Sequence, residues 1–302
     1  MLVQSYMATA AQFAYVTNQG SETVSVVDLK TFKTTAEIKV PGKPAGIARS
    51  VLVPQIYVTA PDNHDVAVID TATNTILRRI QTGGGPVGIA AHPTNGLIYV
   101  ADWYSSSLAV VDPQAGRVIQ TIEVGQSPSG VAVTADGTMI LTADRDSDAV
   151  SIIDAKTNIR QAQIKVGVRP FGITLDQSGT RAYTANVGSD DVSVIDLKSL
   201  SVIATVPVGR RPYAIALTPT HAFVTDQYGG TVTVFDLASN KPVQSIDVGD
   251  HPEGIAYDAQ SGSIYVACWF DNELVRIDAA TRMVTGKAKV GDGPRAFGDF
   301  LN

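Results

Sequence analysis

The sequence contains a single cysteine, Cys268, and this scarcity already excludes several kinds of protein. One thiol excludes a disulfide scaffold and any zinc or iron–sulfur cluster held by several cysteines. No run approaches about 18 consecutive apolar residues, so the sequence predicts no transmembrane helix. Charged residues make up only 17% of the 302 residues, against 44% hydrophobic residues, and this balance excludes a disordered chain.

Positive charge is also scarce, because 23 Lys and Arg stand against 29 Asp and Glu, a formal net charge of −6. Nucleic-acid and anionic-membrane binding usually rest on an excess of basic residues. Nucleic acid is therefore a weak third alternative as a partner, supported only by a few arginines beside aromatic residues. The sequence also lacks a Walker loop, a Gly-x-Ser-x-Gly elbow and a dinucleotide fingerprint, which argues against enzymes that use them.

Three landmarks recur seven times, in phase, at steps of 40 or 42 residues. A proline before an aliphatic segment recurs at Pro44, Pro86, Pro128, Pro170, Pro212, Pro252 and Pro294. An aspartate that ends a Val-rich run recurs at Asp28, Asp70, Asp112, Asp154, Asp196, Asp236 and Asp278. A third landmark recurs at Tyr15, Tyr57, Tyr99, Leu141, Tyr183, Phe223 and Tyr265. Each period reads as four short strands without helical spacing, which predicts an all-β, seven-bladed propeller of four antiparallel strands per blade.

The strand count predicts how the ring closes. Strands two to four occur in seven copies, but only six inner strands lie between them. Residues 294–301 carry the inner-strand pattern, whereas residues 1–10 do not. We therefore expect residues 294–301 to complete the first blade beside the strand at Tyr15, within a single domain of residues 1–302. Residues 1–12 would be an N-terminal extension, and truncation after Val290 should cost more stability than loss of the first ten residues.

The repeated segments resemble a known family. Tyr15-Val16-Thr17-Asn18, Tyr57-Val58-Thr59-Ala60 and Tyr265-Val266-Ala267-Cys268 are similar to the signature of the YVTN-repeat seven-bladed β-propeller family. The resemblance covers roughly residues 13–300 and implies the propeller fold. It also implies a surface-layer or periplasmic protein, although the first 12 residues lack the basic start and apolar core of a signal peptide. Related propellers include lactonases, antibiotic lyases and dehydrogenase subunits, so the resemblance implies no single function.

Two sets of repeated polar residues have structural interpretations. The repeated aspartate is followed three residues later by Thr or Ser in six of the seven blades, which predicts a tight turn capped by the carboxylate. A partial polar ring at the channel mouth consists of Asn18, Asp102, Asp144, Asn186 and Asp226. We expect this ring to cap loop amides. The alternative is that it holds water or a divalent cation along the channel; no other cofactor is predicted.

The residues that differ between blades lie mostly in two loop sets, the crossings into the inner strands and the loops after the second strands. Chain direction places both sets on one face, at the channel mouth. Their large or charged members include Trp103, Tyr104, Arg145, Arg169, Phe171, Arg211, Tyr213, Tyr228, Trp269, Phe270 and Arg295. Aromatic and cationic side chains together predict a binding surface for a small molecule, a peptide or a glycan. The alternative is that the aromatic rings only pack between neighbouring blades.

A second function class remains open at the same face. His251 and Glu253 flank Pro252, and in an extended segment they would point to one side as an acid–base pair. Arg211 or Arg295 would then stabilise negative charge, which predicts a hydrolase or lyase for a lactone or an ester. The alternative is a solvated histidine and a salt-bridged glutamate. Cys268 is either a nucleophile beside His251 or a buried inert thiol. The four histidines share no metal-ligand spacing, and the sequence does not indicate an oligomeric state.

Overall fold

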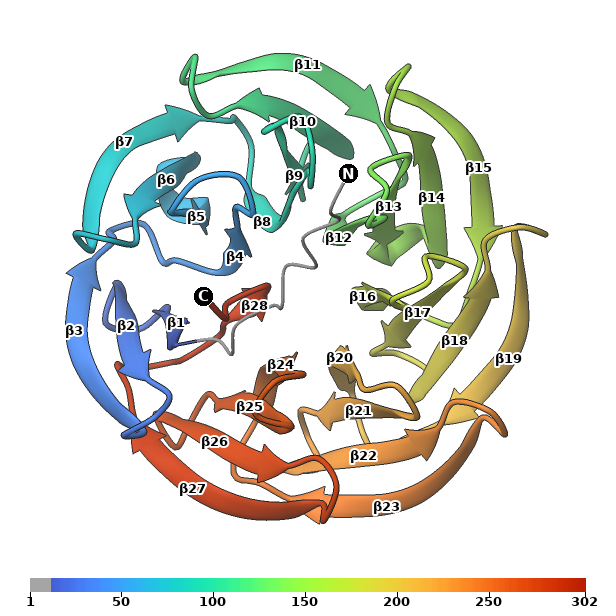
Figure 1. Ribbon diagram of the computed structural model, residues 1–302. Helices are drawn as coiled ribbons and strands as arrows, with labels where there is room; N and C mark the ends of the chain where they lie inside the picture. The colour runs from blue at the N-terminus through green and yellow to red at the C-terminus, as the bar shows by residue number, and fades with distance from the viewer. Residues whose placement is uncertain (1–11) are drawn as a thin grey trace, which may run out of the picture.

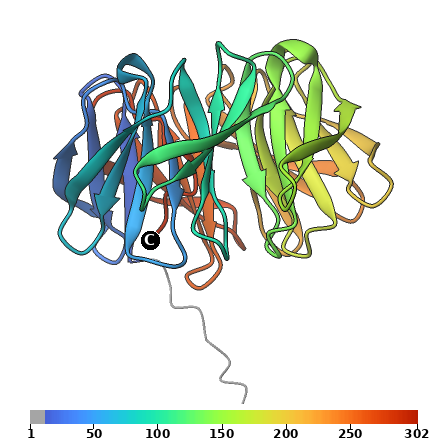
Figure 2. The same cartoon turned by 90° about the horizontal axis from the view of Figure 1, so that it is seen from above.

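The computed structural model describes residues 12–302, which form seven sheets arranged in a ring around a central channel (Figure 1). Residues 1–11, which hold most of the expected N-terminal extension, lie outside the described residues. The sheets are the predicted blades, and five of them consist of four antiparallel strands. The sheet of β1, β2 and β3 has three strands, and the sheet that contains β4 to β7 has a fifth, β28. Figure 2 shows the ring from the side, with the connecting loops gathered at its two faces. None of the helices in residues 12–302 is long and apolar enough to span a membrane.

The strands follow the same order in each blade, from the channel outward. The inner strands are β4 (Gly46–Arg49), β8 (Pro86–Ala91), β12 (Pro128–Val133), β16 (Pro170–Leu175), β20 (Pro212–Leu217) and β24 (Pro252–Asp258). The second strands are β1 (Phe13–Asn18), β5 (Gln55–Ala60), β9 (Ile98–Asp102), β13 (Met139–Asp144), β17 (Arg181–Asn186), β21 (His221–Asp226) and β25 (Ser263–Cys268).

The third and outer strands complete the blades. The third strands are β2 (Thr23–Asp28), β6 (Asp65–Asp70), β10 (Ser107–Asp112), β14 (Ala149–Asp154), β18 (Asp191–Asp196), β22 (Thr231–Asp236) and β26 (Glu273–Asp278). The outer strands are β3 (Lys33–Lys39), β7 (Thr75–Gln81), β11 (Arg117–Glu123), β15 (Ile159–Lys165), β19 (Ser201–Pro207), β23 (Lys241–Asp247) and β27 (Met283–Lys289). Two 3-10 turns, η1 (Pro61–Asn63) and η2 (Arg145–Ser147), lie between second and third strands.

Burial explains the sequence pattern of the strands. Second and third strands such as β17 and β18 are buried on both sides because neighbouring blades cover them, so their apolar residues run almost continuously. Outer strands such as β3 alternate between exposed and covered positions because only one side faces the ring. The inner strands approach one another at the repeated glycine: a Cβ at Gly88 would lie 1.8 Å from Ser129 O, and one at Gly254 would lie 2.1 Å from Ala296 O. The repeated glycine therefore allows the inner strands to pack closely around the channel.

Residues 294–301 close the ring beside β1, as predicted. The backbone amide of Arg295 donates to Thr17 O at 2.7 Å, and that of Tyr15 donates to Phe300 O at 2.8 Å. The same segment also contains β28 (Phe297–Gly298), which pairs in parallel with β4 of the next blade (Figure 1). Phe300 is 1% exposed and lies in the same core cluster as Tyr15. One short segment therefore joins two blades.

The repeated aspartates cap turns on the face opposite the channel mouth. Asp28 Oδ1 accepts hydrogen bonds from the amide of Thr31 at 2.6 Å and from its hydroxyl at 2.8 Å. The same pair of bonds recurs at Asp70, Asp154, Asp196, Asp236 and Asp278, while Asp112 caps through backbone amides alone because Ala115 has no hydroxyl. The hydrogen bonds from Thr31 lower the pKa of Asp28. The turn interpretation is confirmed.

Candidate functional site

A pocket of about 280 Å³ lies at the channel mouth, and we call it the mouth pocket. It is lined by Trp103, Arg145, Phe171, Val187, Arg211, Tyr213, Gln227 and Arg295. Six of these eight residues belong to the set that the sequence predicts to bind a ligand; Val187 and Gln227 do not. The residues come from five blades, so the pocket exists only because the repeat brings equivalent loop positions to one place.

Aromatic rings form the floor of the mouth pocket. Phe171 and Tyr213 follow the repeated proline at the start of β16 and β20, and both side chains are buried. Their ring centroids are 4.4 Å apart, and Phe171 lies 5.0 Å from Phe297 and 6.2 Å from Trp103. Phe297 also lines a larger cavity of about 1290 Å³, the far channel, formed by the later parts of the inner strands. The aromatic cluster therefore stands between the mouth pocket and the far channel.

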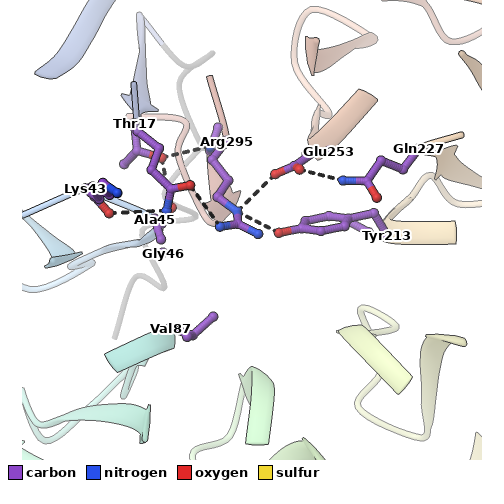
Figure 3. Close-up of polar contacts among 12 residues, drawn as sticks. Thr17, Lys43, Ala45, Gly46, Val87, Tyr213, Gln227, Glu253 and Arg295 are labelled. Atoms are coloured by element: carbon purple, nitrogen blue, oxygen red, sulfur yellow. Dashed lines mark hydrogen bonds and ion pairs between the residues drawn. The ribbon is translucent and has the colours of Figure 1, made fainter. Parts of the chain in front are cut away.

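A buried polar network supports this floor (Figure 3). Arg295 Nε lies 3.0 Å from Glu253 Oε2 and donates to the Tyr213 hydroxyl at 2.8 Å. Arg295 Nη1 also donates to Gln19 Oε1 at 3.3 Å, and Gln227 Nε2 donates to Glu253 Oε1 at 2.6 Å. Burial raises the pKa of Glu253, while the Arg295 charge opposes that shift. Burial also raises the pKa of Tyr213, so its hydroxyl stays protonated.

The other two arginines of the mouth pocket have different surroundings. Arg145 Nη1 contacts Asp146 Oδ1 at 2.5 Å, and its Cζ lies 5.4 Å from the centroid of Trp103. The Arg211 guanidinium lies over Tyr228, with Cζ 4.7 Å from the ring centroid. Its Nε atom is buried without a hydrogen-bond partner, and no carboxylate of residues 12–302 forms an ion pair with its guanidinium. Arg145 therefore has a carboxylate partner within the described residues, whereas the Arg211 guanidinium has none.

The remaining aromatic residues predicted at the mouth surround the pocket without lining it. Tyr104 is 80% exposed, Phe270 61% and Tyr228 50%. Trp269 lies beside Arg295, with 5.6 Å between its ring centroid and the guanidinium carbon. Arg169, also predicted, does not line the pocket either. These loops form a rim around a smaller central site.

The structure gives His251 and Glu253 separate partners. His251 Nδ1 contacts Asp250 Oδ1 at 2.6 Å, and its ring packs edge-on against Phe270 at 4.5 Å. Its backbone has a φ of 52°, so the extended geometry expected from the sequence is absent at this position. Neither residue lines the mouth pocket. Glu253 lies beneath two residues that do, Arg295 and Gln227. Their catalytic roles stay a prediction.

Two members of the polar ring at the mouth, Asp102 and Asp226, cap crossing loops. Asp102 Oδ1 accepts a hydrogen bond from the amide of Gly85 at 2.9 Å, and Asp226 Oδ1 accepts one from Gly209 at 3.0 Å. Burial raises the pKa of Asp226 to about 6, despite hydrogen bonds from two threonines. Within the described residues, no group of three or more His, Cys, Asp and Glu side chains is placed to hold a metal ion.

Cys268 is fully buried at the end of β25. Burial raises the pKa of its thiol to about 12, so the thiolate that a nucleophile needs is scarce at neutral pH. Its Sγ lies 4.0 Å from Val248 O, and no hydrogen bond joins it to His251. These surroundings are those of a structural thiol.

A family model described as a YNCE-like beta-propeller matches residues 95–257, which is more than half of the chain. The chain belongs to the YNCE-like β-propeller family. A second model, the Cytochrome D1 heme domain, matches residues 4–133. The YVTN-type segments found in the sequence are compatible with the YNCE-like family, and no curated protein matches the chain.

Two solved structures are similar to this YNCE-like propeller. A functionally unknown protein from Desulfotomaculum acetoxidans DSM 771 is 15% identical, with a TM-score of 0.81 over 95% of this chain and 99% of the other. Hydrazine synthase from Kuenenia stuttgartiensis is 19% identical, with a TM-score of 0.76 over 85% of this chain and 89% of the other. At these identities the similarity shows the propeller fold alone.

The match to a haem domain can be tested against the residues present. Proteins hold haem iron through His, Cys, Met or Tyr. Within the described chain, neither the mouth pocket nor the far channel is lined by a His, Cys or Met. The Tyr213 hydroxyl is bonded to Arg295, while Tyr183 and Tyr257, which border the far channel, pack against the hydrophobic core. The residues of this YNCE-like propeller therefore do not fit a haem in either cavity.

Proposed function

We propose that this protein binds a small-molecule ligand in the mouth pocket, and that the loop face carrying the pocket is its working face. The observation that carries this proposal is the lining, in which three arginines stand around three aromatic rings from different blades. Ligand sites typically combine an apolar lining with a few convergent polar groups. Aromatic residues that served only to pack blades together would not require an unpaired cationic side chain, that of Arg211, beside them.

The size of the mouth pocket supports a small ligand. A volume of about 280 Å³ corresponds to roughly nine water molecules at about 30 Å³ each. This space suits a single ring system with a few substituents. A peptide or a glycan would place one such group in the pocket and extend over the rim formed by Tyr104, Tyr228 and Phe270.

The test is a binding screen of the full chain by thermal shift and calorimetry, with small aromatic, acidic and sugar compounds. Binding stabilises the folded state by about RT ln(1 + [L]/Kd), so a ligand raises the melting temperature. Trp103→Ala should weaken binding about tenfold to a hundredfold, because it removes one aromatic wall. Tyr104→Ala is the matched control, since its ring is the next side chain along but points to solvent. Equal losses in both variants would contradict a site in the mouth pocket.

One observation keeps the hydrolase or lyase as a second candidate. Burial raises the pKa of Glu253 beside Arg295 and Tyr213, and such perturbed groups often occur at functional sites. Because Glu253 lies beneath the pocket lining, a reaction would require the ligand to displace Arg295 or Gln227. His251→Ala and Glu253→Gln would each abolish hydrolysis of a lactone or ester while leaving the fold intact. Turnover that persists in His251→Ala would reject the catalytic role of that residue.

A further inference from the structure

The three arginines of the mouth pocket differ in how much of their charge is already neutralised. Arg295 faces the buried Glu253 carboxylate, and its side chain is only 22% exposed. Arg145 contacts Asp146. Arg211 is the exception among the described residues: Asp190 accepts a hydrogen bond from its backbone amide at 2.7 Å, but no carboxylate pairs with its guanidinium. The pocket lining thus carries about one uncompensated positive charge.

The Arg211 guanidinium is also oriented before any ligand arrives. Its Cζ atom lies 4.7 Å from the centroid of the Tyr228 ring, a contact that restricts the side chain without satisfying its donors. The Nε atom is buried without an acceptor, so the protein leaves this guanidinium partly unsatisfied. An anion that contacts the guanidinium would supply the acceptor that the protein does not. Arg binds carboxylates well because its planar fork matches two carboxylate oxygens.

The rest of the lining indicates what the anion is attached to. Trp103, Phe171 and Tyr213 present ring surface within the same small volume as Arg211. A second negative charge on the ligand would have no free partner, because Arg145 and Arg295 already face Asp146 and Glu253. An unpaired charge in a partly dry site is unfavourable. These features favour a flat ligand with one negative charge.

We propose that the mouth pocket selects a small aromatic monocarboxylate, with the carboxylate bound by Arg211 and the ring packed against Trp103 and Phe171. This inference rests on the proposed function, since it names the chemical class of the ligand of that pocket. It assigns different roles to similar residues: Arg211 contacts the ligand, whereas Arg295 supports the floor. The pocket then recognises charge and shape through separate side chains.

The experiment compares three probes by calorimetry on the full chain at low salt: naphthalene-2-carboxylate, the neutral naphthalene-2-carboxamide and 2-naphthyl phosphate. The first two have nearly the same shape and differ in charge. We expect the carboxylate to bind at least tenfold more tightly than the amide and than the phosphate. Arg211→Ala should weaken carboxylate binding about tenfold to a hundredfold and leave amide binding unchanged, as expected for one charge-assisted hydrogen-bonded pair.

Arg210→Ala is the matched control, because Arg210 is the exposed neighbour and does not line the pocket. Arg211→Lys, which keeps the charge without the planar fork, tests the same point if Arg211→Ala does not fold. Equal affinity for carboxylate and amide, or equal losses in the Arg210 and Arg211 variants, would overturn the inference. If those probes still bind and lose affinity in Trp103→Ala, the proposed function stands. Tighter binding of the phosphate, or no binding of any probe, would also overturn the proposed ligand class. In that case the wider compound screen, repeated with Trp103→Ala, decides whether the mouth pocket is a binding site at all.

Discussion

Replacing Glu253 by Gln tests whether Arg295 is a structural residue, as the ion pair beneath the mouth pocket suggests. The change keeps the shape of the side chain and the acceptor oxygen that Gln227 uses, but it removes the negative charge 3.0 Å from Arg295 Nε. The Glu253 side chain is 5% exposed and that of Arg295 is 22% exposed. Water can therefore replace little of the electrostatic stabilisation that Arg295 loses. The expected result is a less stable protein that keeps its fold.

The magnitude follows from the distance and the burial. At 3.0 Å and an effective dielectric constant of about 20, Coulomb's law gives roughly 5–6 kcal/mol of attraction. Desolvation of the two charges offsets part of this attraction, and removal of one partner of a buried pair typically costs about 3–5 kcal/mol. Because Arg295 retains some exposure, we expect Glu253→Gln to cost about 2–4 kcal/mol. At about 2 °C per kcal/mol for a chain of this size, the melting temperature should fall by roughly 4–8 °C.

The assay is urea unfolding of the wild type, Glu253→Gln, Arg295→Met and the double variant, which together form a double-mutant cycle. We expect a coupling energy of at least about 1.5 kcal/mol, because the double variant leaves no unpaired charge. Glu273→Gln is the control, since Glu273 pairs with two lysines, Lys287 and Lys289, whose side chains are 45% and 77% exposed. This change should cost less than about 1 kcal/mol. A coupling energy below about 0.5 kcal/mol would refute the assignment of Arg295 as a structural residue.

Three further predictions follow from buried groups. The pKa of Asp226, raised to about 6 in the folded protein from an ordinary 3.8, means that its protonated form favours folding at low pH and that this stability is lost as the pH rises through about 6. Asp226→Asn places the amide found at Asn18 in the equivalent position. Its free energy of unfolding should exceed that of the wild type by up to about 3 kcal/mol at pH 8 and by less at pH 5. Unfolding midpoints that shift equally at both pH values would contradict this prediction. Cys268 should not react with a thiol reagent until the protein unfolds, and rapid labelling of the native protein would show that the thiol is accessible. Gly88→Ala should cost about 1–3 kcal/mol or more in urea unfolding, because its Cβ would lie 1.8 Å from Ser129 O; a cost below about 0.5 kcal/mol would show that the inner strands can separate freely.

The fold could be predicted because the same pattern of four strands occurs seven times in the sequence. Prolines at steps of 40 or 42 residues are the first residues of five inner strands and lie just before β4. Counting inner strands identified residues 294–301 as the missing one. The pairing of β28 with β4 was not predicted. Nothing in the sequence of Phe297 and Gly298 indicates a contact with the neighbouring blade, since that contact depends on how closely the inner strands converge.

The position of the candidate site could be predicted from the sequence, but the contacts within it could not. Equivalent positions in the repeat lie on one face, so the positions of Trp103 and Arg211 indicate the mouth. Which arginine is neutralised depends on contacts across the ring, such as that of Arg295 with Tyr213, 82 residues away. The orientation of His251 depends on a left-handed backbone before a proline, where an extended backbone is the usual preference. Local sequence does not report either feature.

The closing segment has a consequence for synthesis of the chain. The strand β1 is among the first parts of the propeller to be made, but its channel-side partner, residues 294–301, follows only after β27. Until then the blade presents an open edge with free backbone donors and acceptors, which is the kind of edge that pairs with other chains. A chain that ends after β27 would therefore have seven copies of the second, third and outer strands, and β1 would have no partner on its channel side. Residues 294–301 therefore decide whether the propeller is a closed ring or carries an edge that can start aggregation.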